Sequence, residues 1–196
     1  MVVRPTASAE PRLSFETRSA WAVWLAKNHR GCSGVWLRLA KKSSGVASVT
    51  YPEAIDTALC YGWIDGQKKP DDESYWLQRF TPRTGKSIWS KINREKALAL
   101  IASRRMRAAG RKEIERAKAD GRWEGAYDGA RTSTVPADLQ AALDRNKKAK
   151  AFFATLDGAN RYAILFRVQT AKKPQTRAKR IQTFIQMLAR HEKLHP

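Results

Sequence analysis

Cysteine and histidine are scarce in this sequence of 196 residues, which holds two cysteines and three histidines. Two cysteines are too few for a disulfide scaffold, so Cys32 and Cys60 are expected to be free thiols, and the apolar stripe before Cys60 favours a packed side chain over a nucleophile. The histidines, His29, His191 and His195, have no metal-ligand spacing with either cysteine. We therefore expect no metal site and no cofactor.

Long apolar runs are absent as well. No stretch approaches the ~18 consecutive apolar residues that span a bilayer. The opening residues also lack the apolar core of a secretory signal, which is about 7 to 15 residues long. The sequence therefore predicts no membrane insertion and a cytoplasmic location.

Acidic residues are few: 18 Asp and Glu stand against 38 Lys and Arg, which gives a formal charge of +20. A field of this sign attracts an anionic partner, with nucleic acid as the leading candidate, although a merely solubilising surface is the alternative. Residues 140–196 alone hold 13 basic and 3 acidic residues, whereas all seven tryptophans lie between Trp21 and Trp123. This uneven distribution indicates two substructures, of which the second is the more basic.

The patterns along the chain predict an α+β fold, with a small antiparallel sheet and helices in the N-terminal two-thirds and a helical C-terminal part. Residues 1–14 lack periodicity and are expected to form a flexible lead-in. The α+β domain then covers residues 15–110, a connecting segment 111–132, and a basic helical region 133–196. The sequence leaves the oligomeric state open.

Local signals place the individual elements. Trp21 and Trp24 share the inward face of a first helix, and Thr50 with Glu53 has the spacing of a capping box that opens a second helix. Strands are expected over residues 35–41, 63–66 and 75–80, the last two as a hairpin.

Helices are expected to dominate after the hairpin. The first covers residues about 89–109 and is ended by Gly110, and a short charged helix follows to Gly121. The last helix has an apolar stripe from Ile181 to Leu188 at helical spacing, and Thr176 is its expected cap.

Several sequence blocks carry a family resemblance. They are ALCYGWIDG (residues 58–66), RFTPR (79–83), SIWSKIN (87–93) and the later KKPQTRAKRI (172–181). In their order and spacing they make the chain resemble the YdeI/OmpD-associated, bacteriocin-protection family from about residue 15 to residue 190. The resemblance implies a stress- or bacteriocin-resistance protein and implies no molecular activity, so a non-catalytic role is favoured.

Polar and aromatic groups gather between the hairpin and the helix after it. The candidates for an anion- or ligand-binding cleft are Trp63, Asp65, Arg79, Arg83, Ser87, Trp89 and Asn93. Guanidinium groups bind phosphate or carboxylate in bidentate fashion, and a helix beginning near Ser87 would offer free N–H groups to the same anion. The structural alternative pairs Asp65 with Arg79 or Arg83 and places the tryptophans in the core.

The sequence does not match the known catalytic motifs considered for it. The run GKS at residues 85–87 resembles the end of a phosphate-binding loop, but Phe80 stands where the first glycine of that motif belongs. The alternative to a non-catalytic role is an enzyme or small-ligand binder. It would use a cleft around Asp65, Arg83 and Asn93 on a phosphorylated or carboxylated small molecule.

The C-terminal region supplies a second candidate surface, for nucleic acid. Its members are Lys172, Lys173, Arg177, Lys179 and Arg180. Each phosphate contact by such a side chain releases counterions, so binding would weaken steeply with salt. A solvated helix face is the alternative interpretation. A protein partner is a third class, which would require an exposed apolar patch.

Overall fold

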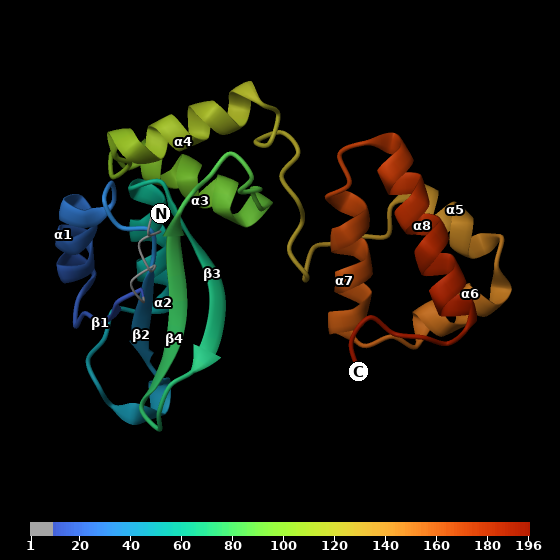
Figure 1. The fold of residues 1–196 in the computed structure, drawn as a ribbon, viewed down its shortest axis with the longest axis horizontal. Coiled ribbons are helices and arrows are strands. Elements are labelled where there is room, and N and C mark those ends of the chain that lie inside the picture. Colours follow the sequence, from blue (N-terminus) through green and yellow to red (C-terminus); the bar gives the residue numbers. More distant parts are fainter. Residues whose placement is uncertain (1–9) are drawn as a thin grey trace, which may run out of the picture. The chain divides into compact units, whose positions relative to one another are not determined.

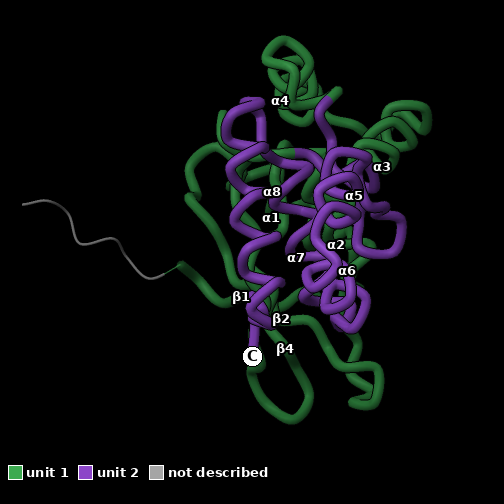
Figure 2. The backbone as a smooth tube through the Cα atoms, turned by 90° about the vertical axis from the view of Figure 1, so that its right-hand side faces the viewer, with its two compact units in different colours: residues 1–88, 93–124 green, residues 89–92, 125–196 purple. Residues whose placement is uncertain are grey.

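The computed structural model of the protein describes residues 10–196. Within that range the chain forms two compact units, coloured separately in Figure 2: unit 1 comprises residues 10–88 and 93–124, and unit 2 comprises residues 89–92 and 125–196. Unit 1 combines a sheet with helices, and unit 2 contains helices α5 to α8 (Figure 1). The predicted α+β fold with a helical C-terminal part is thus confirmed.

Four strands of unit 1 form one sheet in the order β1-β2-β4-β3. They are β1 (Arg12–Ser14), β2 (Val35–Ala40), β3 (Trp63–Pro70) and β4 (Tyr75–Pro82). The sheet is mixed rather than antiparallel throughout, because β1 pairs in parallel with β2 while the other pairs are antiparallel. Helix α1 (Arg18–Asn28) connects β1 to β2 and supplies the crossover that a parallel pair requires.

Strand β1 was not predicted, because it falls in the segment 1–14 that was expected to be a lead-in. Residues 1–9 of that segment lie outside the described residues, while Arg12–Ser14 pair with the part of β2 that begins at Trp36. Three residues are too few to show the alternation by which a strand is recognised in a sequence.

The predicted hairpin is confirmed, and both of its strands are longer than the alternating runs. β3 lies at an edge of the sheet and carries a bulge over residues 65–68. The buried side-chain amide of Gln78 donates to the carbonyl groups of Gly66 and Gln67, at 3.0 and 3.1 Å, so these two carbonyls at the bulge are hydrogen-bonded. Beyond the bulge, the exposed segment 68–70 holds two lysines and a proline.

Helix α1 and helix α2 (Tyr51–Cys60) bury the faces that the sequence indicated. Trp21 is fully buried, and its indole N–H donates to the carbonyl of Ala54 at 3.1 Å. Trp24 stacks on Trp21 with ring centroids 5.3 Å apart but is only half-buried. The capping box is present, since the Thr50 side chain accepts from the Glu53 N–H and the Glu53 carboxylate accepts from the Thr50 N–H.

The helix expected over residues 89–109 and ended by Gly110 was wrong. The chain forms helix α3 (Lys91–Ala102), leaves it near Arg104, whose φ is 57°, and starts helix α4 (Ala108–Ala119). Gly110 lies inside α4, where an added Cβ would come within 2.6 Å of the carbonyl oxygens of Leu59 and Cys60. The glycine therefore permits the close approach of α4 to the end of α2 rather than ending a helix.

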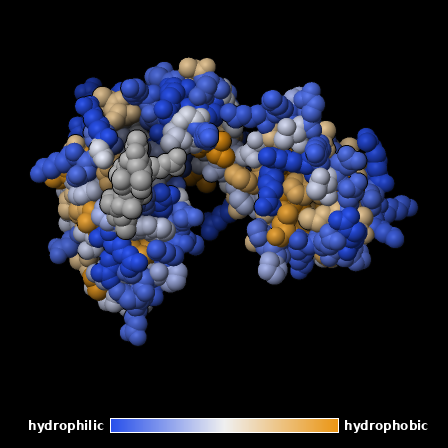
Figure 3. All heavy atoms as spheres, viewed as in Figure 1, coloured by the Kyte–Doolittle hydropathy of each residue, from blue (hydrophilic) through white to orange (hydrophobic). Residues whose placement is uncertain are grey.

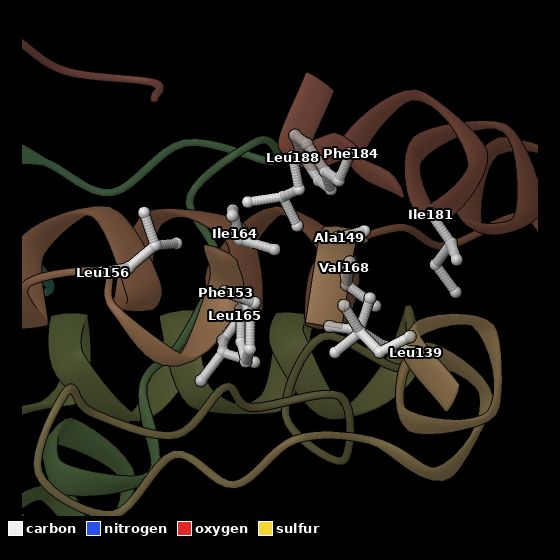
Figure 4. Close-up of a cluster of buried hydrophobic side chains, with 11 residues drawn as sticks. Leu139, Ala149, Phe153, Leu156, Ile164, Leu165, Val168, Ile181, Phe184 and Leu188 are labelled. Carbon is white, nitrogen blue, oxygen red and sulfur yellow. The ribbon is translucent and has the colours of Figure 1, made fainter. Parts of the chain in front are cut away.

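Unit 2 is built from helices α5 (Ala137–Asp144), α6 (Lys147–Ala154), α7 (Gly158–Gln169) and α8 (Pro174–Ala189). Their apolar faces meet in one buried cluster, shown in Figure 4. It consists of Leu139, Leu143, Ala149, Phe153, Leu156, Ile164, Leu165, Val168, Ile181, Phe184 and Leu188. The cap expected at Thr176 was wrong: Lys173 is the N-cap and Pro174 opens α8, because a proline needs no N–H in the first turn.

The surface drawn in Figure 3 is mainly hydrophilic on both units. Large apolar side chains that are exposed in the described part of the chain are Val23, Val46, Tyr51, Ile88, Ile92 and Leu98. Binding of a protein partner to exposed apolar residues stays a prediction. None of the described helices is both long and apolar enough to cross a membrane.

Candidate anion-binding sites

The seven residues of the predicted cleft do not converge on one point. Asp65 lies opposite Phe80 in the β3–β4 pair, so its neighbour on β4, Arg79, projects from the other face of the sheet. Asp65 accepts a hydrogen bond from the Tyr51 hydroxyl at 2.7 Å. Arg79 instead binds Glu10 through Nε and Nη2, at 2.8 and 2.5 Å, and these bonds hold the pKa of Glu10 below its ordinary value. The pairing of Asp65 with Arg79 was therefore wrong.

Ser87 does not begin a helix, which corrects the expected helix N-terminus. It lies in a loop four residues before α3, and its hydroxyl accepts from the Thr84 N–H at 2.9 Å. The loop is held by Arg122, whose Nη1 donates to the Ser87 carbonyl at 2.7 Å and whose Nε binds Asp120 at 2.8 Å. Arg122 is 4% exposed, and its side chain stabilises the loop from inside the unit. This role was not predicted from the sequence.

Trp63 and Arg83 do come together, at a pocket of about 450 Å³ within unit 1 that we call pocket A. Trp63 is buried and donates its indole N–H to the carbonyl of His29 at 3.1 Å, so it forms part of the wall. Arg83 is 5% exposed, and its Nη1 donates to the Ile88 carbonyl at 3.3 Å. Neither Trp89, which is buried in unit 2, nor Asn93 lines this pocket. The full lining is His29, Arg30, Tyr61, Gly62, Trp63, Pro82, Arg83, Ala108, Ala109, Lys112, Glu113 and Arg116.

Positive charge predominates in pocket A. Arg30, Arg83, Lys112 and Arg116 line it, against the single carboxylate of Glu113, which is paired with Arg116. Arg116 also donates to the Arg83 carbonyl at 3.3 Å. Cationic residues therefore outnumber acidic ones among the described residues that line this hollow of small-molecule size.

Three of these cations were missed by the sequence analysis. Arg30 follows the end of α1, while Lys112 and Arg116 lie four residues apart on one face of α4. The i, i+4 spacing was the only signal in the sequence, and it does not say which other segment the face meets. Tertiary packing alone brings this face beside Arg83.

The basic segment of unit 2 divides into two kinds of residue. Arg177 binds Asp138 at 2.6 and 2.8 Å and donates to the Val168 carbonyl at 2.8 Å, and Arg180 donates to the Arg167 carbonyl at 2.5 Å. These two arginines therefore satisfy carbonyl groups in the last turn of α7. The pair with Arg177 also lowers the pKa of Asp138.

The lysines of the same segment are exposed. Lys172, Lys173 and Lys179 have no carboxylate within 4.0 Å among the described residues. Of the five positions predicted to contact nucleic acid, these three remain available on the surface of unit 2, whereas Arg177 and Arg180 are committed to the fold.

Other chemistry finds little support in the described chain. No group of three or more His, Cys, Asp or Glu side chains within residues 10–196 is arranged to hold a metal ion. Burial raises the pKa of the Cys60 thiol, which disfavours the thiolate that a nucleophile would need.

Comparison with known protein families divides the chain in two. Residues 13–113 match the model of a domain of unknown function (DUF8412), and residues 132–191 match the model described as bacteriocin-protection, YdeI or OmpD-associated. The suspected family is confirmed over the C-terminal part only, and the blocks at residues 58–93 that suggested it lie in the range of the other model. No curated protein and no solved structure matches the chain.

Proposed function

Because this chain belongs to the family defined by a domain of unknown function (DUF8412) and carries a bacteriocin-protection, YdeI- or OmpD-associated domain, we propose that it is a non-catalytic resistance protein that binds an anionic partner. Nucleic acid is the leading partner. The observation that carries the proposal is the predominance of cationic residues in the lining of pocket A.

The arrangement of pocket A suits a phosphate group. Like charges repel one another, so an anion bound in pocket A would offset the repulsion between the exposed cations Arg30 and Lys112 that line it. Arg83 is buried in the wall of the pocket, where its positive charge is poorly screened by solvent. Planar guanidinium groups bind phosphate oxygens in bidentate fashion, which adds geometric selection to the charge.

The three exposed lysines of unit 2 support nucleic acid as the partner. Lys172, Lys173 and Lys179 can follow a phosphate backbone without reading bases, because a lysine is a flexible point charge. Binding of this kind is insensitive to sequence and sensitive to salt.

The test is a titration of fluorescent oligonucleotides, followed by anisotropy at several salt concentrations. Arg30→Ala/Lys112→Ala removes two exposed cations of pocket A, and we expect at least about a tenfold loss of affinity at low salt. The matched control is Lys42→Ala/Lys86→Ala, which removes the same charge from exposed positions of unit 1 outside pocket A. Pyrophosphate should compete for the wild-type site. Absence of binding at low salt, or an equal loss in the control, contradicts the proposal.

A second candidate function is the binding or conversion of a small phosphorylated or carboxylated molecule. The volume of pocket A favours it, since pockets of about 300 to 1,000 Å³ hold such ligands. Asp65 and Asn93, which the sequence suggested for this role, do not line the pocket, so any catalytic group would be another residue. Tight pyrophosphate binding without oligonucleotide binding would favour this candidate.

A further inference from the structure

A second cationic hollow adjoins pocket A in unit 1. This hollow, which we call pocket B, has a volume of about 190 Å³. Its lining is Arg18, Ser19, Ala22, Thr57, Cys60, Tyr61, Arg105 and Arg107. Among residues 10–196, three arginines and no carboxylate thus line pocket B. Tyr61 lines both hollows, so one aromatic side chain stands between two groups of cations.

We propose that the partner is single-stranded nucleic acid, which crosses unit 1 at Tyr61 with successive phosphates in pockets A and B and a base against the tyrosine ring. This inference rests on the proposed function, because it names the form of nucleic acid that the same site accepts. Proteins that bind single strands combine cationic grooves with aromatic rings in this way.

The shape of the cations favours a single strand over a duplex. Both sets of arginines line hollows rather than a flat surface. A duplex is a stiff rod whose bases are stacked inside, so it cannot bend one strand into two small hollows without losing base pairs. A single strand turns freely at each phosphate and presents its bases for stacking.

The sizes of the two pockets fit different parts of the strand. Pocket A, at about 450 Å³, has room for a nucleotide, and its lining includes the residues His29, Tyr61 and Trp63 as well as cations. Pocket B, at about 190 Å³, has room for a phosphate and part of its sugar. Arg18, Arg105 and Arg107 of pocket B form no ion pair with a carboxylate within 4.0 Å in the described part of the chain, and Arg18 contributes at longer range to the lowered pKa of Glu53.

The backbone around Tyr61 explains how the ring comes to stand there. Tyr61 is the C-cap of α2, and Gly62 follows with φ of 74°, a left-handed conformation that favours glycine. A Cβ on Gly62 would come within 3.0 Å of the Ala109 carbonyl oxygen, so the turn packs directly on α4. The half-buried Tyr61 ring lies 5.4 Å from that of His29, tilted by 53°, which limits its movement.

Cys60 also lines pocket B, but it is part of the wall. It is buried, and burial raises the pKa of its thiol despite the nearby Arg105 and Arg107, so it remains protonated near neutral pH. The arginines of pocket B are therefore not there to activate a nucleophile.

The experiment compares a labelled thymidine 12-mer with a duplex of the same length, with the full chain at low salt. We expect the single strand to bind at least about tenfold more tightly. Tyr61→Leu should weaken its binding by about fivefold to a hundredfold, which corresponds to the loss of one stacked base, while Tyr61→Phe should bind like the wild type. Arg105→Ala/Arg107→Ala should lower the salt slope by about 1.4, and the control Lys42→Ala/Lys86→Ala should not lower it.

The outcomes separate this inference from the proposed function. If the duplex binds as tightly as the single strand, and neither Tyr61→Leu nor Arg105→Ala/Arg107→Ala changes affinity while Arg30→Ala/Lys112→Ala does, the single-strand path is wrong and pocket A alone remains. If neither oligonucleotide nor pyrophosphate binds, both proposals fail. If Tyr61→Leu lowers the melting temperature markedly, the binding of Arg105→Ala/Arg107→Ala tests the single-strand path instead. That variant keeps the hydrogen bond from the Arg107 backbone N–H to the Cys60 carbonyl.

Discussion

Replacing Gly110 by alanine should destabilise unit 1, although the position lies inside a helix. Helix propensity alone predicts a gain of about 0.8 to 1.0 kcal/mol for glycine to alanine. The new Cβ, however, would lie 2.6 Å from the carbonyl oxygens of Leu59 and Cys60 and 2.4 Å from the sulfur of Met106. The methionine can turn away, but the two carbonyls are fixed by the end of α2.

The size of the effect follows from these distances. To restore an ordinary contact of 3.4 Å, α4 and the end of α2 must separate by about 0.8 Å. Overpacking of this kind costs about 1 to 3 kcal/mol, and contact with two backbone oxygens at once places Gly110 at the upper end or above it. After the gain in helix propensity, we expect a net loss of about 2 kcal/mol or more.

Urea unfolding followed by tryptophan fluorescence is the appropriate assay, because six of the seven tryptophans lie in unit 1. A loss of this size lowers the urea midpoint by about 1 M. Gly31→Ala is the control, since an added Cβ there meets nothing within 4 Å. If Gly110→Ala is as stable as the wild type or more stable, the close approach of α4 to α2 does not require glycine and the reasoning is refuted.

Further predictions concern the core, the basic segment, acid stability and location. Trp21→Ala should cost about 3 to 5 kcal/mol by urea titration, and Trp24→Ala clearly less, because only Trp21 is fully buried; equal losses would contradict this. The triple change Lys172→Ala/Lys173→Ala/Lys179→Ala should flatten the salt slope for duplex DNA by up to about 2.7 with an unchanged melting temperature. Arg177→Ala should instead lower the thermal stability of unit 2, and a change in oligonucleotide binding alone would show that its bonds to Asp138 and Val168 are dispensable. The pKa of Asp138 is lowered in the folded state, so its contribution is present above the unfolded pKa of about 3.9 and is lost as pH falls below it. Asp138→Asn should therefore reduce the loss of stability between about pH 4 and pH 2 in an acid titration followed by circular dichroism, by less than about 1 kcal/mol because the carboxyl is half-exposed. Cell fractionation should recover the protein with the cytoplasm, and recovery mainly with membranes or periplasm would contradict the expected location.

The elements that sequence reasoning placed correctly are those specified by local chemistry. The Thr50 and Glu53 capping box, the hairpin and the apolar stripe of α8 each depend on residues within a few positions of one another. The prediction at Gly110 was wrong because the local sequence does not distinguish a glycine that ends a helix from one that lets two helices touch. Only the packing of α4 against the end of α2 distinguishes them.

The candidate site was less accessible to prediction for a related reason. Asp65 and Arg79 are both polar and close in sequence, but the β3–β4 register sends them to opposite faces of the sheet. The cations that do surround Arg83 come from the end of α1 and from α4, which no short motif connects. Charge can be counted from a sequence, whereas its convergence depends on tertiary packing.

The edge of the sheet has a bearing on solubility. β3 is an edge strand, and an unprotected edge can pair with the same edge of another molecule and start an aggregate. Here the bulge at residues 65–68 interrupts the row of free backbone groups, two lysines oppose the approach of a like-charged copy, and Pro70 offers no N–H donor. The strand that completes the hairpin thus also opposes edge-to-edge association, and replacing Lys68, Lys69 and Pro70 by threonine or valine should increase the tendency of the protein to aggregate on concentration.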